Sequence, residues 1–190
     1  VNQTYKVDEI IISDDNSQDK TLQIAQEFLK DQAISYDIKS NKNRLGPYKN
    51  FERAIKSCSG DLIFLSDHDD IWFPNKIEEH VYLHRKNIST LAFTNDCFIS
   101  DQNLNTFGAS KMNNLLSAGH DLRSMVMGCC CSFKKKILQY ALPFPDEFKG
   151  HDNWLCSLAD KMESREFIPK KLQLYRQHGR NTSTYFANNP

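Results

Sequence analysis

The stretch Leu62-Ile63-Phe64-Leu65-Ser66-Asp67-His68-Asp69-Asp70-Ile71-Trp72 decides the fold of this chain. Its first four residues are all apolar, which is typical of a short strand buried on both faces of a parallel sheet. Three carboxylates follow within four residues. Because open α/β sheets bind ligands at the carboxyl ends of their strands, this acidic turn is predicted to lie in a ligand site.

The acidic turn is predicted to hold a divalent cation. Three carboxylates this close repel one another unless positive charge lies among them. Asp67 and Asp69 point to similar sides of an extended turn, so one ion can use both, directly or through water. Hard oxygen ligands favour Mg²⁺ or Mn²⁺ over zinc. The alternative is a solvated acidic turn that caps the next helix.

The region before this turn shows the same pattern of an apolar strand followed by carboxylates. Residues 9–13 indicate a buried strand that ends at Asp14 and Asp15. The segments that follow are a helix over 19–32, a strand over 36–40, a loop over 43–48 and a helix over 51–58. Strands and helices that alternate at this spacing predict crossover units in a parallel sheet. Two acidic strand ends would then face one crevice, although either carboxylate alone could be a helix cap.

The rest of the chain continues the domain less regularly. The expected elements are a helix over 74–87, a strand over 91–94, a loop-rich segment over 101–119, a strand over 128–133, a helix over 151–161 and a strand over 172–177. The sequence contains no internal repeat, low-complexity tract or linker. We therefore expect residues 1–190 to form a single α/β domain.

Composition excludes several classes of protein. The chain has 190 residues with 24 Lys and Arg against 24 Asp and Glu, so a broad basic surface for nucleic acid is not expected. No apolar run approaches the ~18 residues needed to span a bilayer, so we expect a soluble domain. Of the six cysteines, Cys129, Cys130 and Cys131 are adjacent and no CxxC pair occurs, which favours buried free thiols in a reducing cytoplasm.

Several catalytic motifs are absent from the sequence. His80 and His84 stand four residues apart, but no Glu follows His80, so they are expected to pack or face solvent. The chain also lacks the P-loop, the GxGxxG dinucleotide motif and the GxSxG nucleophile elbow.

Two further residues can carry chemistry. Asp152 is expected in the first turn of a helix, where a carboxylate can be a cap or, if it projects into a cleft, a base. His178 follows the last predicted strand. A lone histidine at such a place is more often structural than a ligand.

The ordered set of motifs resembles a family-2 glycosyltransferase of the GT-A fold, in a branch with many bacterial rhamnosyltransferase-like proteins. The matching residues are Asp14-Asp15-Asn16-Ser17 with Asp19, Asn43 with Gly46 and Asn50, Gly60-Asp61 leading to 66–72, Gly128-Cys129 before Phe133, His151-Asp152, and 175–179 with Asn181. The resemblance implies a Rossmann-like, three-layer α/β/α domain with a mostly parallel central sheet.

The resemblance also implies roles for these residues. Asp14 and Asp15 would contact the base and ribose of a nucleotide sugar, with Asn43, Gly46 and Asp67 in the same pocket. Asp67 and Asp69 match the DxD motif, which holds Mn²⁺ or Mg²⁺ on the pyrophosphate. Asp152 matches the catalytic base of inverting members. His178 matches a position near the metal or the diphosphate in some members.

The implied reaction is inverting transfer of a hexosyl or deoxyhexosyl group from a nucleoside diphosphate sugar to an acceptor hydroxyl. The acceptor would be a saccharide or a lipid-linked saccharide, in the synthesis of bacterial cell-surface polysaccharide. The family places such an enzyme in the cytoplasm, with peripheral contact to the inner face of the membrane. Two alternatives remain open at this point: a non-catalytic nucleotide-sugar-binding module of the same fold, and a metal-dependent phosphohydrolase or nucleotidyltransferase.

The sequence departs from the family pattern at its start. Family members begin with another strand, and residues 1–5 resemble the stretch that follows that strand. The expectation is that the first strand and helix of the fold are missing from this chain, which would leave strand edges unpaired.

Overall fold

The computed structural model describes residues 2–178 and 181, and it begins with a small parallel sheet. Strand β1 (Glu9–Asp14) pairs with β2 (Ser35–Ser40) in parallel, and helix α1 (Thr21–Leu29) connects them. Three consecutive isoleucines give β1 its strand character, because β-branched side chains fit a pleated surface. Asp14 lies opposite Ser40 at the carboxyl end of the pair.

A second, six-stranded sheet forms the centre of the molecule. Its strands are β3 (Leu62–Phe64), β4 (Ile71–Trp72), β5 (Ala92–Ser100), β6 (Thr106–Ser110), β7 (Cys131–Lys134) and β8 (Arg165–Arg176). The order is β3-β7-β5-β8-β4, with β6 on β5. Within this sheet only β5 and β8 are parallel. The prediction of a mostly parallel central sheet is therefore wrong, because this sheet is mixed.

The connections explain why the sheet is mixed. Parallel neighbours need a crossover of a dozen or more residues, as in the first two strands. Strand β6 follows β5 after a short turn and therefore pairs with it in the antiparallel direction. Strand β7 is antiparallel to β3, and β4 is antiparallel to β8. A buried apolar strand has the same composition in either direction, so its sequence does not encode this difference.

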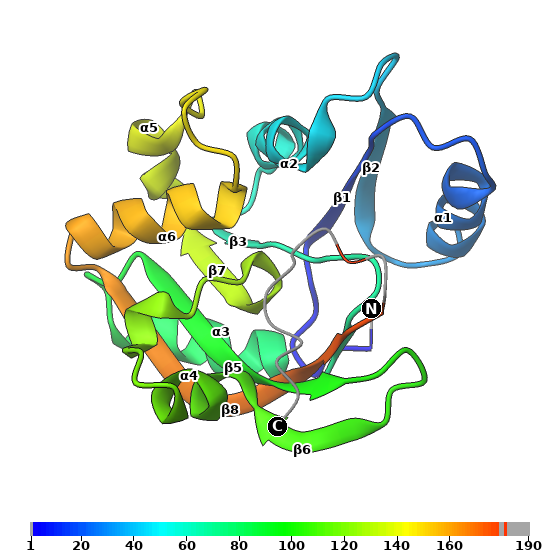
Figure 1. Ribbon diagram of the computed structural model, residues 1–190. Coiled ribbons are helices and arrows are strands. Elements are labelled where there is room, and N and C mark those ends of the chain that lie inside the picture. Colours follow the sequence, from blue (N-terminus) through cyan, green and yellow to red (C-terminus); the bar gives the residue numbers. More distant parts are fainter. Residues whose placement is uncertain (1, 179–180, 182–190) are drawn as a thin grey trace.

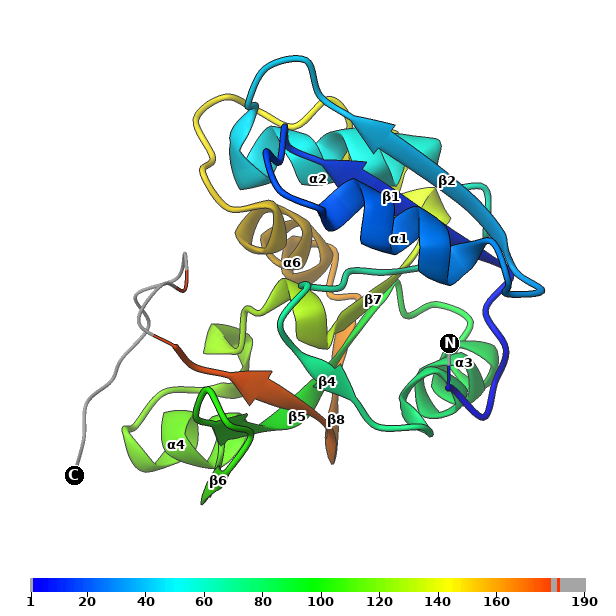
Figure 2. The same ribbon diagram turned by 90° about the vertical axis from the view of Figure 1, so that its right-hand side faces the viewer.

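Helices cover both faces of the six-stranded sheet. They are α2 (Gly46–Ser57), α3 (Lys76–Lys86), α4 (Lys111–Ser117), α5 (Leu138–Ala141) and α6 (His151–Lys161), with 3₁₀ turns at Leu122–Ser124, Gly128–Cys130 and Lys135–Ile137. Figures 1 and 2 show α2, α5 and α6 together on one side and α3 on the other.

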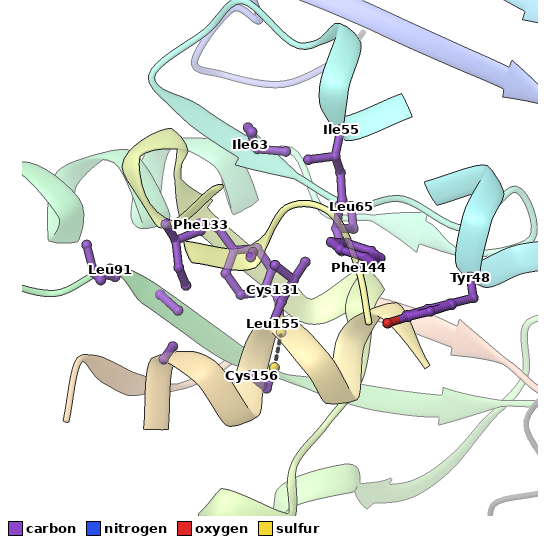
Figure 3. Packing of buried hydrophobic residues seen from close by; sticks show 14 residues of the cluster. Tyr48, Ile55, Ile63, Leu65, Leu91, Cys131, Phe133, Phe144, Leu155 and Cys156 are labelled. Carbon is purple, nitrogen blue, oxygen red and sulfur yellow. Dashed lines mark hydrogen bonds between the residues drawn. The ribbon is translucent and has the colours of Figure 1, made fainter. Parts of the chain in front are cut away.

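Alternate residues of β7 show how the two faces differ. Phe133 packs into the main apolar cluster with Ile55 of α2 and Leu155 of α6 (Figure 3). Ser132, which points the other way, has its hydroxyl 2.7 Å from His80 Nδ1 and 2.8 Å from His84 Nε2. Both histidines are buried on α3, so their expected packing role is confirmed.

Several predicted boundaries differ from the structure. Helix α2 begins at Gly46, inside the predicted loop over 43–48, and β8 begins seven residues before the predicted strand over 172–177. The segment 101–119 was predicted to be loop-rich but contains β6 and α4. Both elements are short, with five residues in β6 and seven in α4, so neither gives a long periodic pattern in the sequence.

A cavity of about 1200 Å³ separates the two sheets. Among the described residues, β1 pairs with β2 alone and β3 with β7 alone, so one edge of each strand is left unpaired. Ile10 and Ile11 of β1 and Leu62 and Phe64 of β3 line this cavity. Figure 2 shows the β1–β2 pair, with α1 and α2, at one end of the molecule. The expectation of a missing strand stays a prediction.

Over the residues that the structure describes, no helix combines the length and the apolar character that crossing a bilayer would require. All six cysteines are free, as the sequence indicated, and only Cys58 is not fully buried.

Candidate functional site

The acidic turn after β3 meets the segment before β7. One carboxylate oxygen each from Asp67 and Asp70 and the Sγ atom of Cys129 all lie within 4.8 Å of one another. Asp67 and Asp70 come from the loop that connects β3 to β4, whereas Cys129 lies in the 3₁₀ turn Gly128–Cys130. Residues separated by about sixty positions in the sequence thus form one potential cation site.

The electrostatics of this site are unfavourable without a cation. Burial and, after it, the charges of Asp70, Asp69 and Asp152 together raise the pKa of the Asp67 carboxyl to about 6, against an opposing effect of Cys129. Burial also raises the pKa of Asp70. Carboxylates whose ionised form is disfavoured by burial and by one another are stabilised by a bound cation.

Asp70 is held in place by β8. Its Oδ1 accepts a hydrogen bond of 3.0 Å from the backbone N–H of Arg176, and its Oδ2 accepts one of 3.3 Å from Gln173 Nε2. Gln173 is fully buried. The strand β8 thereby fixes the orientation of this carboxylate.

A buried cation lies beneath the acidic turn. Lys76, at the first position of α3, has no exposed surface, and its Nζ donates to the carbonyl of Cys129 and to Oε1 of Gln173. The same ammonium lies 4.0 Å from the centroid of the Trp72 ring. Burial lowers the pKa of Lys76, against the nearby thiols and Asp70. This lysine ties α3, β8 and the 3₁₀ turn together.

The two remaining predicted metal residues pair with each other. His178 Nε2 lies 2.9 Å from Oδ2 of Asp69. The structure therefore brings Asp67 and Asp70 to the potential cation site, whereas Asp69 is paired with His178. The assignment of Asp69 and His178 as metal ligands stays a prediction.

Asp152 lies in the first turn of α6. Its Oδ2 accepts a weak bond of 3.4 Å from the N–H of Gly128, and its Oδ1 accepts one of 2.8 Å from the N–H of Asn153. His151 stacks on Phe51 of α2 with ring centroids 3.7 Å apart. A Cβ on Gly128 would come within 2.8 Å of His151 Nε2. A glycine at position 128 is thus required for the start of α6 to lie this close to the 3₁₀ turn Gly128–Cys130.

Asp14 links the loop after β1 to the end of β2. Its Oδ2 accepts hydrogen bonds from Ser17 N at 3.0 Å and from Ser40 Oγ at 2.7 Å. Burial works to raise the pKa of this carboxyl, but these hydrogen bonds outweigh it and leave the pKa below its ordinary value.

Asp15 organises the loop before α2. Its two oxygens accept from Asn41 Nδ2 at 2.8 Å, Leu45 N at 2.7 Å and Gly46 N at 2.9 Å. These bonds outweigh burial and lower the pKa of the carboxyl, and Gly46 has a φ of +79°. Asn43 lies exposed in the same loop. The predicted nucleotide residues Asp15, Asn43 and Gly46 therefore belong to one structural unit.

The residues present fit a divalent cation. Two carboxylates and a thiol offer anionic or polarisable ligand atoms at close range, and burial together with the neighbouring carboxylates raises the pKa of Asp67. The sequence predictions missed Asp70, Cys129, Lys76 and Gln173. Asp70 stood beside the predicted ligands, but nothing in the sequence signals that 129 and 173 reach the turn after β3.

The chain matches a known family over most of its length. The family model for Glycosyl transferase family 2 matches residues 1–140.

Curated relatives point to glycan synthesis. The chain is 32% identical to the dTDP-rhamnosyl transferase RfbG of Shigella flexneri, and the match covers 90% of this chain and 63% of that protein. It is 28% identical to the GalNAc(5)-diNAcBac-PP-undecaprenol beta-1,3-glucosyltransferase of Campylobacter jejuni, over 92% of this chain and 57% of that protein. The chain thus spans less than two thirds of the length of either relative.

Solved structures share the fold. The mannosyltransferase PcManGT of Pyrobaculum calidifontis, in complex with GDP-Man and Mn²⁺, superposes with a TM-score of 0.75 at 15% identity, covering 94% of this chain and 51% of that one. TarS of S. aureus, in complex with UDP, gives 0.69 at 16% identity over 93% and 54%. At this identity the likeness concerns the fold alone, and it confirms the α/β GT-A fold.

Proposed function

Because this chain belongs to glycosyl transferase family 2, we propose that it transfers a hexosyl or deoxyhexosyl group from a nucleoside diphosphate sugar to an acceptor hydroxyl, with inversion at the anomeric carbon. The observation that supports this most is the contact of Asp152, from α6, with the N–H of Gly128, the residue before the Cys129 that lies beside Asp67 and Asp70. An inverting transfer needs a base and a site for the leaving diphosphate on opposite sides of one carbon.

Asp67 and Asp70 are the residues that we propose to hold a Mn²⁺ or Mg²⁺ ion, with Asp69 and His178 next to them. When bound, such an ion offsets the negative charge that develops on the departing diphosphate. The buried frame of Gln173 and Lys76 fixes Asp70 and the turn that carries Cys129, so the chain keeps its carboxylates in place without an ion. A preformed site of this kind reduces the reorganisation needed when the donor binds.

Asp152 is the proposed catalytic base. A hydroxyl is a weak nucleophile until its proton is removed, and a carboxylate within hydrogen-bond reach contributes typically ~10² to 10⁴ in rate. Each of its oxygens accepts one backbone N–H bond, which leaves further lone pairs to accept the acceptor's proton. Gly128 and the stacked His151 hold the start of α6 against the acidic turn.

The loop between β2 and α2 is the proposed wall for the nucleotide. The oxygens of Asp14 and Asp15 accept hydrogen bonds from the chain around them, so their contribution is to hold the backbone and to offer the remaining lone pairs to ribose and base. Asn43 is exposed in this loop, and its side-chain amide is open to a ligand.

The acceptor is proposed to be a saccharide or a lipid-linked saccharide in bacterial cell-surface polysaccharide synthesis. This follows from the relatives, of which one is named for a rhamnosyl transfer and another for an undecaprenol-linked acceptor. We further propose that the protein works in the cytoplasm, with peripheral contact to the inner face of the membrane.

The test is a screen of UDP-, GDP- and dTDP-linked sugars for release of the nucleoside diphosphate with Mn²⁺ and a polyprenyl-diphosphate-linked saccharide. Two variants accompany it. Asp152→Asn should lose at least ~10² in turnover while keeping donor binding, because the base is removed and the diphosphate site is not. The exposed Asp31→Asn, which lies after α1, is the matched control and should match the wild type.

Three outcomes distinguish a transferase from a binding module and from a phosphohydrolase. Transfer that fails in Asp152→Asn and persists in Asp31→Asn supports the proposal. Donor binding without transfer to any acceptor indicates a binding module. Cleavage of the donor by water to a nucleoside monophosphate and a sugar 1-phosphate, with no sugar on the acceptor, indicates a phosphohydrolase.

A further inference from the structure

We propose that the thiol of Cys129 is a third protein ligand of the divalent cation, beside Asp67 and Asp70. The inference rests on the proposed function, because it concerns the cation of that same site. It gives this protein a mixed oxygen and sulfur ligand set, where the predicted ligands were the carboxylates of Asp67 and Asp69 and the imidazole of His178.

The geometry carries the inference. The Sγ atom and one oxygen of each carboxylate are mutually within 4.8 Å, close to the largest separation of two ligands that share one ion at metal–ligand distances of about 2.0 to 2.3 Å. Cys129 is 1% exposed, so its Sγ cannot turn towards solvent. The proximity of the thiol works to lower the pKa of both carboxyls, against the effect of burial. A cation that replaces the thiol proton would keep these three groups together.

The frame around Cys129 holds the sulfur in place. Its carbonyl accepts from Lys76 Nζ, and its Sγ accepts a hydrogen bond of 3.2 Å from Gln173 Nε2. Gln173 donates to Asp70 through the same nitrogen. One buried amide therefore bridges the sulfur and a carboxylate, which is how outer residues commonly orient metal ligands.

The neighbouring thiols differ from Cys129. Cys130 packs with Cys97 and with Cys129 itself in one apolar cluster, but its Sγ atom is not grouped with the two carboxylates. Cys131 lies on the other face, where its Sγ is 3.6 Å from that of Cys156 (Figure 3). Neither belongs to the group of ligand atoms. Cys130 thus provides a matched control one residue away.

The chemical consequence is a change in metal preference. When the sulfur–metal bond forms, the S–H bond breaks and the proton passes to the buffer, so binding releases a proton. Thiolate ligands favour the softer ions, whereas carboxylates and water suit Mg²⁺ and Mn²⁺. We expect Co²⁺ and Cd²⁺ to bind more tightly than Mg²⁺, and Cys129→Ser to weaken Co²⁺ and Cd²⁺ binding at least about tenfold with little change for Mg²⁺.

The experiment is optical titration of the purified protein with Co²⁺, alone and with UDP, GDP or dTDP. A thiolate ligand produces a sulfur-to-cobalt charge-transfer band in the near ultraviolet, which carboxylates do not. The wild type and Cys130→Ser should show the band, and Cys129→Ser should lose it while still binding Mg²⁺ and Mn²⁺ through the carboxylates. Circular dichroism checks folding, and Cys129→Ala replaces the serine variant if that variant unfolds.

The outcomes are distinguishable from those of the proposed function. Cobalt binding without a charge-transfer band, or a band that survives in Cys129→Ser, overturns the proposal that Cys129 is a metal ligand. Neither result bears on the proposed sugar transfer. Failure of Co²⁺ to bind under any of these conditions also overturns the ligand proposal. Loss of sugar transfer to every acceptor, with the band present, contradicts the proposed function and leaves the thiol ligand standing.

Discussion

At the scale of single residues, the carboxylate of Asp67 combines a cost in stability with a functional role. Its pKa of about 6 lies above the ordinary value of 3.8 because of burial and three neighbouring carboxylates. Since the folded state binds the proton more tightly than the unfolded chain, ionisation destabilises the fold as pH rises from about 4 to 6. The ion-binding function therefore opposes stability at neutral pH.

We predict that Asp67→Asn stabilises the cation-free protein at pH 7.5 by up to about 3 kcal/mol, since the shift spans about two pKa units. The gain should shrink towards pH 4, where the wild-type carboxyl is protonated in the folded protein. Thermal unfolding with a chelator at both pH values measures it. A gain that is the same at pH 4 and pH 7.5 would contradict the electrostatic origin.

A second residue-scale prediction concerns Gly128. Gly128→Ala places a Cβ 2.8 Å from His151 Nε2, and the stacking of His151 on Phe51 prevents an easy retreat. The start of α6 must then move, and turnover should fall roughly 10- to 100-fold with donor binding nearly kept, because small displacements of a catalytic group are costly. Steady-state kinetics gives both quantities.

The control for that variant is Gly60→Ala. A Cβ at Gly60 would have its nearest contacts at 3.7 Å, an ordinary van der Waals distance. Equal losses of turnover in the two variants would show that the effect is not specific to the approach of Gly128 to α6.

At the scale of elements, the loop before α2 involves one residue with a structural role, Asp15, and one proposed to bind a ligand, Asn43. Asp15→Ala removes two hydrogen bonds from the backbone at the start of α2 and one from Asn41, and it should cost about 1 kcal/mol, the typical value for a helix cap. The pKa of Asp15 is lowered, so this contribution is present above about pH 4 and is lost as pH falls through the folded-state pKa.

The matched variant is Asn43→Ala in the same loop. Because Asn43 is exposed, its loss should leave the unfolding free energy within about 0.5 kcal/mol of the wild type and weaken nucleotide binding. Asp15→Ala should change both quantities. Calorimetric titration with UDP, GDP and dTDP, together with urea unfolding, measures them, and unchanged nucleotide binding in Asn43→Ala would remove that residue from the site.

At the scale of the whole molecule, the two sheets should differ in local stability. The β1–β2 pair is largely half-buried and is separated from β3 by a cavity, whereas β5 is almost entirely buried between two strands. Segments with few buried contacts open more easily. We predict that hydrogen exchange in β1 and β2 is at least tenfold faster than in β5.

Exchange followed by mass spectrometry measures this difference for peptides from each strand. Equal protection of β1, β2 and β5 would show that the molecule opens as one unit. A nucleotide that binds beside Asp15 should slow exchange in β1 and β2 more than in β5, because that loop joins the pair to α2.

The sequence by itself determined the local elements. Continuous apolar runs identified β1 and β3, and the helical period identified α1, α3 and α6 to within a few residues. The position of the carboxylates after each strand followed from the same patterns. These features depend on neighbouring residues, whose spacing the sequence displays directly.

Only the tertiary structure decided strand direction and the composition of the site. The sheet is mixed because non-local pairing, which the apolar pattern of a strand does not encode, sets whether neighbours run parallel. Asp70 joins Asp67 because β8 orients it, and Cys129 joins them because the chain returns before β7. The sequence thus determined which carboxylates end the strands, and packing of distant segments determined which ligand atoms share one site.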